Sequence, residues 1–130
     1  MIFGIGTDIV RVDRMQRNIH RFGDRFAQRI LSTSEYEDYR KAGQPAHFLA
    51  KRFAAKEATV KAMGTGFSLG ITLKQISVDH DLAGKPELVL TGDAKAYLDS
   101  NGITRSHISI ADEQDHAVAF VTLSIGDTDM

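Results

Sequence analysis

The chain opens with a short apolar run that gives way to a helical pattern. Residues 1–10 are apolar on both faces and rich in β-forming residues, which predicts a buried strand with Asp8 as its one charged exception. In residues 12–30 the apolar side chains fall within about 80° of arc at helical spacing. We therefore expect a helix here, which Gly23 kinks or splits in two.

The middle of the chain predicts a short helix followed by a long one. Ser34 and Glu37 have the spacing of a capping box, so we expect the short helix to begin there and to end near Gly43. The long helix covers residues 45–63 and has a proline at its first position, where proline is well tolerated. Gly64 ends it, because glycine readily takes the left-handed conformation that follows a helix.

The second half of the chain is mostly β. Strands are expected at residues 71–80, 87–90, 106–111 and 116–125, the last two as a hairpin. One helix, capped by Thr91 or Asp93, ends near Gly102, and the tail 126–130 is expected to be loose. This order favours an α+β fold in one domain, residues 1–130, with an antiparallel sheet packed against the long helix. Exposed sheet edges favour an oligomer.

Composition limits the available chemistry. The chain has no cysteine, which excludes a disulfide framework, a cysteine-rich zinc site and a thiol nucleophile. No basic residue precedes the first apolar run and no apolar stretch could cross a bilayer, so we expect a cytoplasmic protein with no membrane partner. The net charge is −1, but residues 1–86 hold 14 Lys and Arg against 9 Asp and Glu. That excess suits an anionic ligand or partner, with chance unevenness as the alternative.

Two carboxylates stand in apolar surroundings. Asp8 interrupts the first apolar run, and Glu57 has apolar neighbours at helical spacing. A buried carboxylate without a partner is costly, so each needs a cation. An arginine or a backbone cap would satisfy Asp8, and Lys61, four residues further on, would satisfy Glu57. The other interpretation is a magnesium ion held by both carboxylates and by water.

Basic residues share the long helix with Glu57. Lys61 lies about 40° round the helix from Glu57, near enough to contact a phosphate group bound at the metal. Arg52 and Lys56 are either further phosphate contacts or solvated surface charge.

Two weaker signals lie outside the long helix. The turn Gly64-Thr65-Gly66 resembles a phosphate-binding loop, but it follows a helix instead of opening one, so a plain helix stop is the alternative. His107 lies in a predicted strand, where a histidine serves either in packing or as a charged contact to phosphate.

An arginine-rich face lies opposite the apolar side of the first helix. Residues 11–30 contain six arginines, of which Arg14, Arg21 and Arg25 cluster with Arg17 close by. A solvated face is one interpretation, and a docking surface for an acidic helical protein is the sharper one. Nucleic acid is disfavoured, because the chain is slightly acidic and no aromatic residues interleave with the arginines.

Two longer segments carry a family resemblance. They are Gly4-Ile5-Gly6-Thr7-Asp8-Ile9-Val10 and Lys51-Arg52-Phe53-Ala54-Ala55-Lys56-Glu57-Ala58-Thr59-Val60-Lys61-Ala62. Together they resemble the two signature segments of the holo-[acyl-carrier-protein] synthase family. The resemblance continues through Gly64-Thr65-Gly66, Gly84-Lys85-Pro86 and Ser106-His107-Ile108-Ser109-Ile110, so it covers nearly the whole chain in the expected order.

The resemblance implies the single-domain 4'-phosphopantetheinyl transferase fold and a specific reaction. That reaction transfers the 4'-phosphopantetheine arm of coenzyme A to a serine of apo-acyl carrier protein and releases adenosine 3',5'-bisphosphate, in support of fatty acid biosynthesis. The resemblance also implies a homotrimer with active sites at the subunit interfaces. The partners would be coenzyme A, Mg²⁺ and an acidic helical carrier protein.

Site residues follow from the resemblance by matching position. Asp8 and Glu57 are expected to hold Mg²⁺, Lys61 to contact the pyrophosphate, and Glu57 and Lys61 to be catalytic. Arg14 and Arg21 are expected to receive the carrier protein. The coenzyme A site is expected to be lined by Arg52, Lys61, Gly64, Thr65, Gly66, Lys85, Pro86 and His107, partly from a neighbouring subunit.

Two positions depart from the family pattern. Val10 stands where two-domain relatives carry a further acidic residue, so we expect water to fill that coordination position. Ala111-Asp112 stands where many relatives have Ser-His, so a role for that histidine does not carry over.

Two other functions account for part of the pattern. A metal-dependent phosphohydrolase also uses paired acids with lysines, but no nucleophilic aspartate motif or further acidic ligand set is present. A non-catalytic module that docks acidic helical proteins through its arginines leaves the inward-facing Asp8 and Glu57 unexplained.

Overall fold

The structure, a computed structural model, describes residues 1–126. Of the tail that is expected to be loose, residues 127–130 lie outside the described residues. In chain order the elements are β1 (Ile2–Arg11), α1 (Val12–Phe22), α2 (Asp24–Ile30), α3 (Thr33–Arg40), α4 (Pro45–Met63), the 3₁₀ helix η1 (Leu73–Gln75), β2 (Ile76–His80), β3 (Pro86–Leu90), α5 (Gly92–Ser100), β4 (Ile103–Asp112) and β5 (His116–Ile125).

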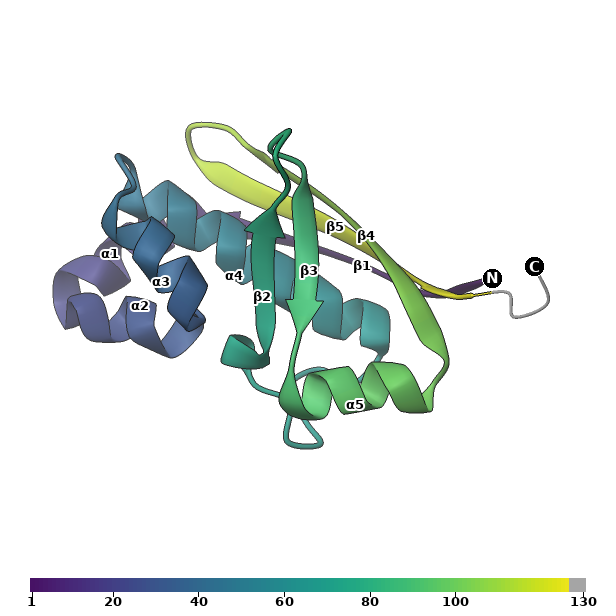
Figure 1. Cartoon of the computed structure of the whole chain (residues 1–130). Coiled ribbons are helices and arrows are strands. Elements are labelled where there is room, and N and C mark those ends of the chain that lie inside the picture. The colour runs from purple at the N-terminus through teal and green to yellow at the C-terminus, as the bar shows by residue number, and fades with distance from the viewer. Residues whose placement is uncertain (127–130) are drawn as a thin grey trace.

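The long helix α4 lies at the centre of the fold. A three-stranded antiparallel sheet in the order β1-β5-β4 lies behind it in Figure 1, and the antiparallel pair β2-β3 crosses in front. Helices α1 to α3 gather at one end of α4 and α5 lies towards the other (Figure 1). The predicted α+β class, with an antiparallel sheet packed against a long central helix, is confirmed.

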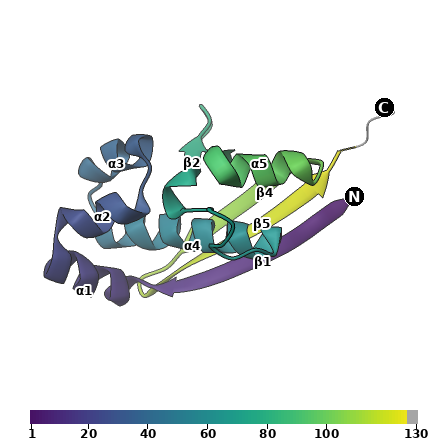
Figure 2. The ribbon, with the colours of Figure 1, turned by 90° about the horizontal axis from the view of Figure 1, so that it is seen from below.

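Two glycines allow α4 to lie directly on β1. A Cβ atom at Gly6 would collide with the backbone oxygen of Ala58, and one at Gly4 would collide with that of Ala62. On the facing side of α4, Ala54, Ala58 and Ala62 are all buried. Figure 2 shows the result from below, with α4 running alongside β1. Small side chains on both partners therefore set the distance between helix and strand.

The two faces of β1 have different surroundings. Gly6 and Val10 are buried beneath α4, whereas Ile5 and Ile9 on the opposite face are 55% and 65% exposed. The expectation that this strand is buried on both faces is therefore wrong within one chain. On the neighbouring strand β5, Val118 and Phe120 are also exposed, so the outer face of the sheet carries an apolar surface.

The helix ends differ from the prediction at one point. Gly23, with a φ of 66°, divides the first helical region into α1 and α2, as its position suggested. The capping box of α3 is formed by Ser32 and Glu35, so its assignment to Ser34 and Glu37 is wrong by two residues. Gly64 ends α4 in the left-handed conformation, as predicted.

The strand predicted at residues 71–80 is shorter in the structure. Only Ile76–His80 form β2, because the preceding residues turn through η1. The side-chain oxygen of Gln75 accepts hydrogen bonds from the backbone N–H of Thr72 at 3.4 Å and of Ala94 at 3.1 Å. One glutamine therefore holds this turn and also caps α5, where Thr91 makes no side-chain capping bond.

We predict that Gly6→Ala lowers the free energy of unfolding by about 1–3 kcal/mol or more, because the new methyl group forces α4 away from β1. Urea denaturation measures this change. Gly43→Ala is the matched control, since a Cβ atom at Gly43 meets nothing within 4 Å. Its effect should stay within about 0.5 kcal/mol. Equal stability of the two variants would contradict the close-packing argument.

Candidate active site

Asp8 and Lys61 form an ion pair between β1 and α4. Lys61 Nζ lies 3.0 Å from Asp8 Oδ1 and donates a second hydrogen bond to the backbone oxygen of Thr7 at 3.1 Å. The Asp8 side chain is 17% exposed, whereas that of Lys61 is 52% exposed. The cation that Asp8 requires is thus Lys61 and not an arginine. Within residues 1–126, Lys61 makes no ion pair with Glu57.

Glu57 lies one helical turn before Lys61 and is half-buried. Burial is the largest cause that raises the pKa of Glu57 above the ordinary value of 4.5, and the neighbouring negative charge of Asp8 raises that pKa further. Lys61 and Arg14 act in the opposite direction. The structure therefore gathers Asp8, Glu57, Lys61 and Arg14 at one edge of the sheet.

The two carboxylates suit a hard divalent cation. Asp8 and Glu57 supply oxygen ligands, and the repulsion that raises the pKa of Glu57 is what a dication would relieve. Among residues 1–126, no group of three or more His, Cys, Asp or Glu could hold a metal ion. One or two carboxylates completed by water and phosphate oxygens are the usual protein ligands of Mg²⁺. The residues present therefore fit a magnesium ion.

Arg52 and Lys56 are buried, so their interpretation as solvated surface charge is wrong. Lys56 is fully buried and Arg52 is 6% exposed. Both pair with Glu35 of α3, which is also fully buried. Glu35 was not predicted as a functional residue from the sequence. The available signal was the Ser32-Thr33-Ser34-Glu35 spacing, which fits a capping box as well as the spacing of Ser34 and Glu37 does.

Arg52 also lines a small pocket on the side of α4 that faces β2 and β3. The pocket has a volume of about 180 Å³, and Arg52 and Pro86 among its lining residues are predicted to line the coenzyme A site. Its other lining residues are Phe48, Lys51, His80, Gly84, Ile110 and Asp112. Lys51 and Arg52 outnumber the one acidic side chain, Asp112, and this balance suits an anionic ligand.

The remaining predicted residues lie elsewhere on the chain. His107 is on β4, opposite Thr122 of β5, and that residue is in turn opposite Ile5 of β1. His107 is exposed and belongs to the same outer row as Ile5. The turn from Gly64 to Gly66 follows the C-terminal end of α4, and Lys85 is exposed in the β2–β3 turn. A single chain therefore does not bring all the predicted residues into one cavity.

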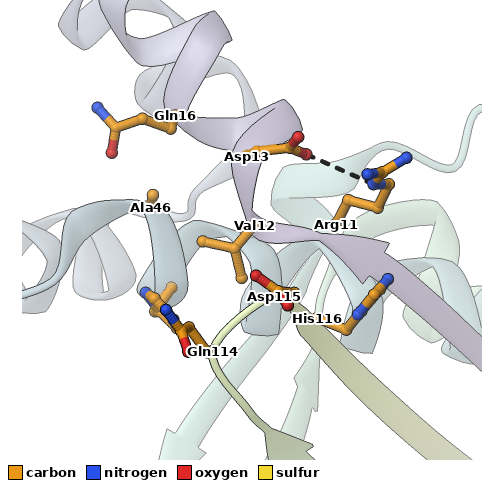
Figure 3. Close-up of a pocket in the computed structure, with 9 residues that line it drawn as sticks. Arg11, Val12, Asp13, Gln16, Ala46, Gln114, Asp115 and His116 are labelled. Atoms are coloured by element: carbon orange, nitrogen blue, oxygen red, sulfur yellow. Dashed lines mark ion pairs between the residues drawn. The ribbon is translucent and has the colours of Figure 1, made fainter.

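A larger hollow contains none of the predicted residues. It has a volume of about 490 Å³ and lies between the start of α1, the start of α4 and the β4–β5 hairpin (Figure 3). Arg11 and Asp13, paired at 3.6 Å, lie at its edge, with Asp115 and His116 on the hairpin side (Figure 3).

Comparison with known proteins defines the class. Residues 4–121 match the family model of the 4'-phosphopantetheinyl transferase superfamily. The chain therefore belongs to this superfamily.

Individual relatives are close in sequence and in structure. The holo-[acyl-carrier-protein] synthase of Halorhodospira halophila is 51% identical over 126 residues, 97% of this chain and 100% of the relative. The crystal structure of the Neisseria meningitidis holo-[acyl-carrier-protein] synthase has a TM-score of 0.91 at 44% identity, over 95% of this chain and 99% of the other. The Bacillus anthracis enzyme, solved in complex with CoA (3',5'-ADP), has a TM-score of 0.78 at 34% identity over 95% of this chain and 96% of the other.

We predict that Glu57→Gln stabilises the metal-free protein at neutral pH but not at acidic pH. A carboxyl group whose pKa is raised on folding stabilises the folded state while the pH is below its pKa in the unfolded chain. That stabilisation is lost as the pH rises through its pKa in the folded protein. Glutamine does not ionise and avoids this loss. Because Glu57 is only half-buried, we expect a gain of no more than about 1 kcal/mol. Urea denaturation in chelator at pH 4 and pH 7.5 measures it, and a variant less stable than wild type at pH 7.5 would contradict the pKa direction.

Proposed function

We propose that this protein is a holo-[acyl-carrier-protein] synthase. It transfers the 4'-phosphopantetheine group of coenzyme A to a serine of apo-acyl carrier protein and releases adenosine 3',5'-bisphosphate, in support of fatty acid biosynthesis. The observation that carries the proposal is the meeting of Asp8, Glu57 and Lys61 between β1 and α4, within the residues that match the superfamily model. Relatives with this named activity span 95–97% of the chain.

Asp8 and Glu57 are the proposed ligands of Mg²⁺. When bound, the ion would supply positive charge to the phosphate oxygens of coenzyme A. Asp8 reaches this position from β1, and Glu57 reaches it from α4, which lies on β1 because of the two glycines.

Lys61 and Glu57 perform separate tasks in the proposed reaction. Lys61 is half-exposed, and its ammonium group contacts the pyrophosphate and stabilises the negative charge that develops during in-line attack by the carrier serine. Glu57 accepts the serine proton, either directly or through one oriented water molecule.

Further predicted contacts come from the pocket beside Arg52 and from the other side of the sheet. Arg52 and Pro86 line that pocket, Lys85 neighbours it, and we assign them to coenzyme A together with His107 and the turn Gly64-Thr65-Gly66. His107 lies on the outer face of the sheet, away from α4. A second copy of the chain would bring these contacts into one site, which supports the proposed homotrimer.

The outer face of the sheet is the proposed trimer interface. Its exposed apolar side chains are Ile5, Ile9, Val118 and Phe120, of which Phe120 is 47% exposed. A contiguous apolar surface of this kind is typical of a protein–protein contact. Burial against other copies would restore the two-sided covering of β1 that the sequence pattern predicts.

Arg14 and Arg21 are the proposed contacts to the acidic carrier protein. Both are exposed on α1, and Arg14 reaches over the ring of Phe53 on α4 at 5.4 Å. The carrier would thus dock beside Glu57, whose pKa Arg14 lowers. Within residues 1–126, no helix is both long and apolar enough for a bilayer crossing. A cytoplasmic location stays a prediction from the sequence.

The reaction is tested by incubating the protein with Mg²⁺, coenzyme A and apo-acyl carrier protein and weighing the carrier by mass spectrometry. We expect a gain of one phosphopantetheine group. Asp8→Asn and Glu57→Gln should each lower the rate by at least about 100-fold while circular dichroism stays unchanged, because each removes a metal ligand. An unmodified carrier with the wild-type protein would exclude the transferase. Substantial activity in either variant would exclude the two-ligand site.

The oligomer is tested by Phe120→Glu, which places a charge in the outer apolar face. We expect the mass in solution, measured by light scattering, to fall from that of a trimer to that of a monomer, because burying an unpaired charge is costly. Phe67→Glu is the control, since Phe67 is 38% exposed but lies outside this face. A monomeric wild-type protein, or dissociation by both variants, would refute the assigned interface.

A further inference from the structure

A buried carboxylate lies at the junction of α3, α4 and β2. Glu35 is completely buried, and its two oxygens accept four hydrogen bonds. Oε1 accepts from the backbone N–H of Ser32 at 2.9 Å and from Lys56 Nζ at 2.6 Å. Oε2 accepts from the backbone N–H of Val78 at 3.0 Å and from Arg52 Nη1 at 3.4 Å. Its hydrogen-bonding capacity is therefore filled by the protein.

The two cations bound by Glu35 differ in how many of their hydrogen-bond donors remain free. Lys56 Nζ also donates to the backbone oxygens of Leu73, at 3.0 Å, and Ile76, so all three of its N–H groups are used. Lys56 is fully buried and cannot reach a ligand. Its place in the cluster is to balance the charge of Glu35 and to tie α4 to the segment that enters β2.

Arg52 keeps part of its guanidinium group free. Within residues 1–126, only Nη1 of Arg52 has hydrogen-bond partners, namely Glu35 and the backbone oxygen of Val78 at 2.9 Å. No fully buried side-chain nitrogen in this part of the chain lacks a partner, so the other Arg52 nitrogens keep some contact with solvent, although the side chain as a whole is only 7% exposed. The guanidinium stacks over the ring of Phe48 at 4.4 Å, and both residues line the 180 Å³ pocket.

The cluster carries a surplus of positive charge next to that pocket. One carboxylate serves two cations, so the charges of Glu35, Lys56 and Arg52 sum to +1. The surplus reaches the pocket through the planar group of Arg52, a geometry suited to bidentate binding of phosphate.

We propose that Glu35 is a positioning residue for the proposed transfer reaction. By holding Nη1, together with the carbonyl of Val78, it fixes the guanidinium plane of Arg52 so that the free nitrogens bind a phosphate group of coenzyme A in the pocket. This inference rests on the proposed function, and it gives Glu35 a role in substrate affinity in addition to its role in packing.

The test compares Lys56→Met with the double variant Lys56→Met/Glu35→Gln. Both lack the ammonium group, so neither leaves a buried lysine unpaired, as Glu35→Gln alone would. They differ in the one change at Glu35, which removes the charged partner of Arg52 and replaces one of the two acceptor oxygens with an amide group. We expect the double variant to show a KM for coenzyme A about tenfold above that of Lys56→Met, with kcat and the KM for the carrier within about twofold. A role in packing alone would not separate the two substrates in this way.

Addition of Arg52→Gln to both variants completes the test. If Glu35 acts through Arg52, the tenfold difference should disappear in this background. A difference that persists, or that is absent from the start, would overturn the proposal.

Measuring transfer by the wild-type protein in the same assay tests the proposed function separately from the role of Glu35. If the wild-type protein modifies no carrier, the function fails, and calorimetric titration of coenzyme A onto the two variants makes the same comparison. Absence of coenzyme A binding by the wild-type protein would overturn both.

Discussion

The contact between α4 and β1 is the constraint on which the rest of the structure depends. Gly4 and Gly6 leave no side chain between the strand and the helix, and the backbone oxygens of Ala58 and Ala62 occupy the space that a Cβ atom would need. This spacing brings Lys61 Nζ within 3.0 Å of Asp8 and brings Glu57 close enough to feel its charge. The family signature in β1 therefore combines two glycines that set a distance with an aspartate that uses it.

Helix α4 has three rows of side chains at i, i+4 spacing, each with a separate task. Ala54, Ala58 and Ala62 face the sheet. The row of Arg52 and Lys56 lies about 160° away and pairs with Glu35, while the row of Glu57 and Lys61 lies between, at the edge next to β1. The buried ion pairs on one side and the alanine packing on the other leave α4 little freedom to rotate. Together these two contacts fix the positions of Glu57 and Lys61 relative to Asp8.

The sequence predicted the elements well wherever a local signal was strong. Gly23, Gly64 and the hairpin before β5 have clear local chemistry, and the structure agrees there. The capping box of α3 was misplaced, because Ser32 and Ser34 both precede a glutamate by three residues and local sequence does not choose between them. The choice depends on tertiary contacts, since Ser32 Oγ is also hydrogen-bonded to Ser77 Oγ at 2.7 Å. The same contacts explain why Glu35 was missed: its partners Arg52 and Lys56 are 17 and 21 residues away.

The candidate site could be predicted only in part, because the sequence pattern indicates costly charges but not the tertiary contacts that they make. Asp8 and Glu57 were conspicuous because a charge in an apolar pattern is costly, but the pattern did not show that Lys61 pairs with Asp8 across two elements. The apolar pattern also overstated the burial of β1 within one chain. A strand face has the same apolar sequence pattern whether it is covered by the same chain or by another copy. Ile5 and Ile9 are exposed in one chain, and His107 shares their face. The proposed second subunit accounts for both features, because it would cover the apolar surface and would supply the site residues that one chain leaves apart.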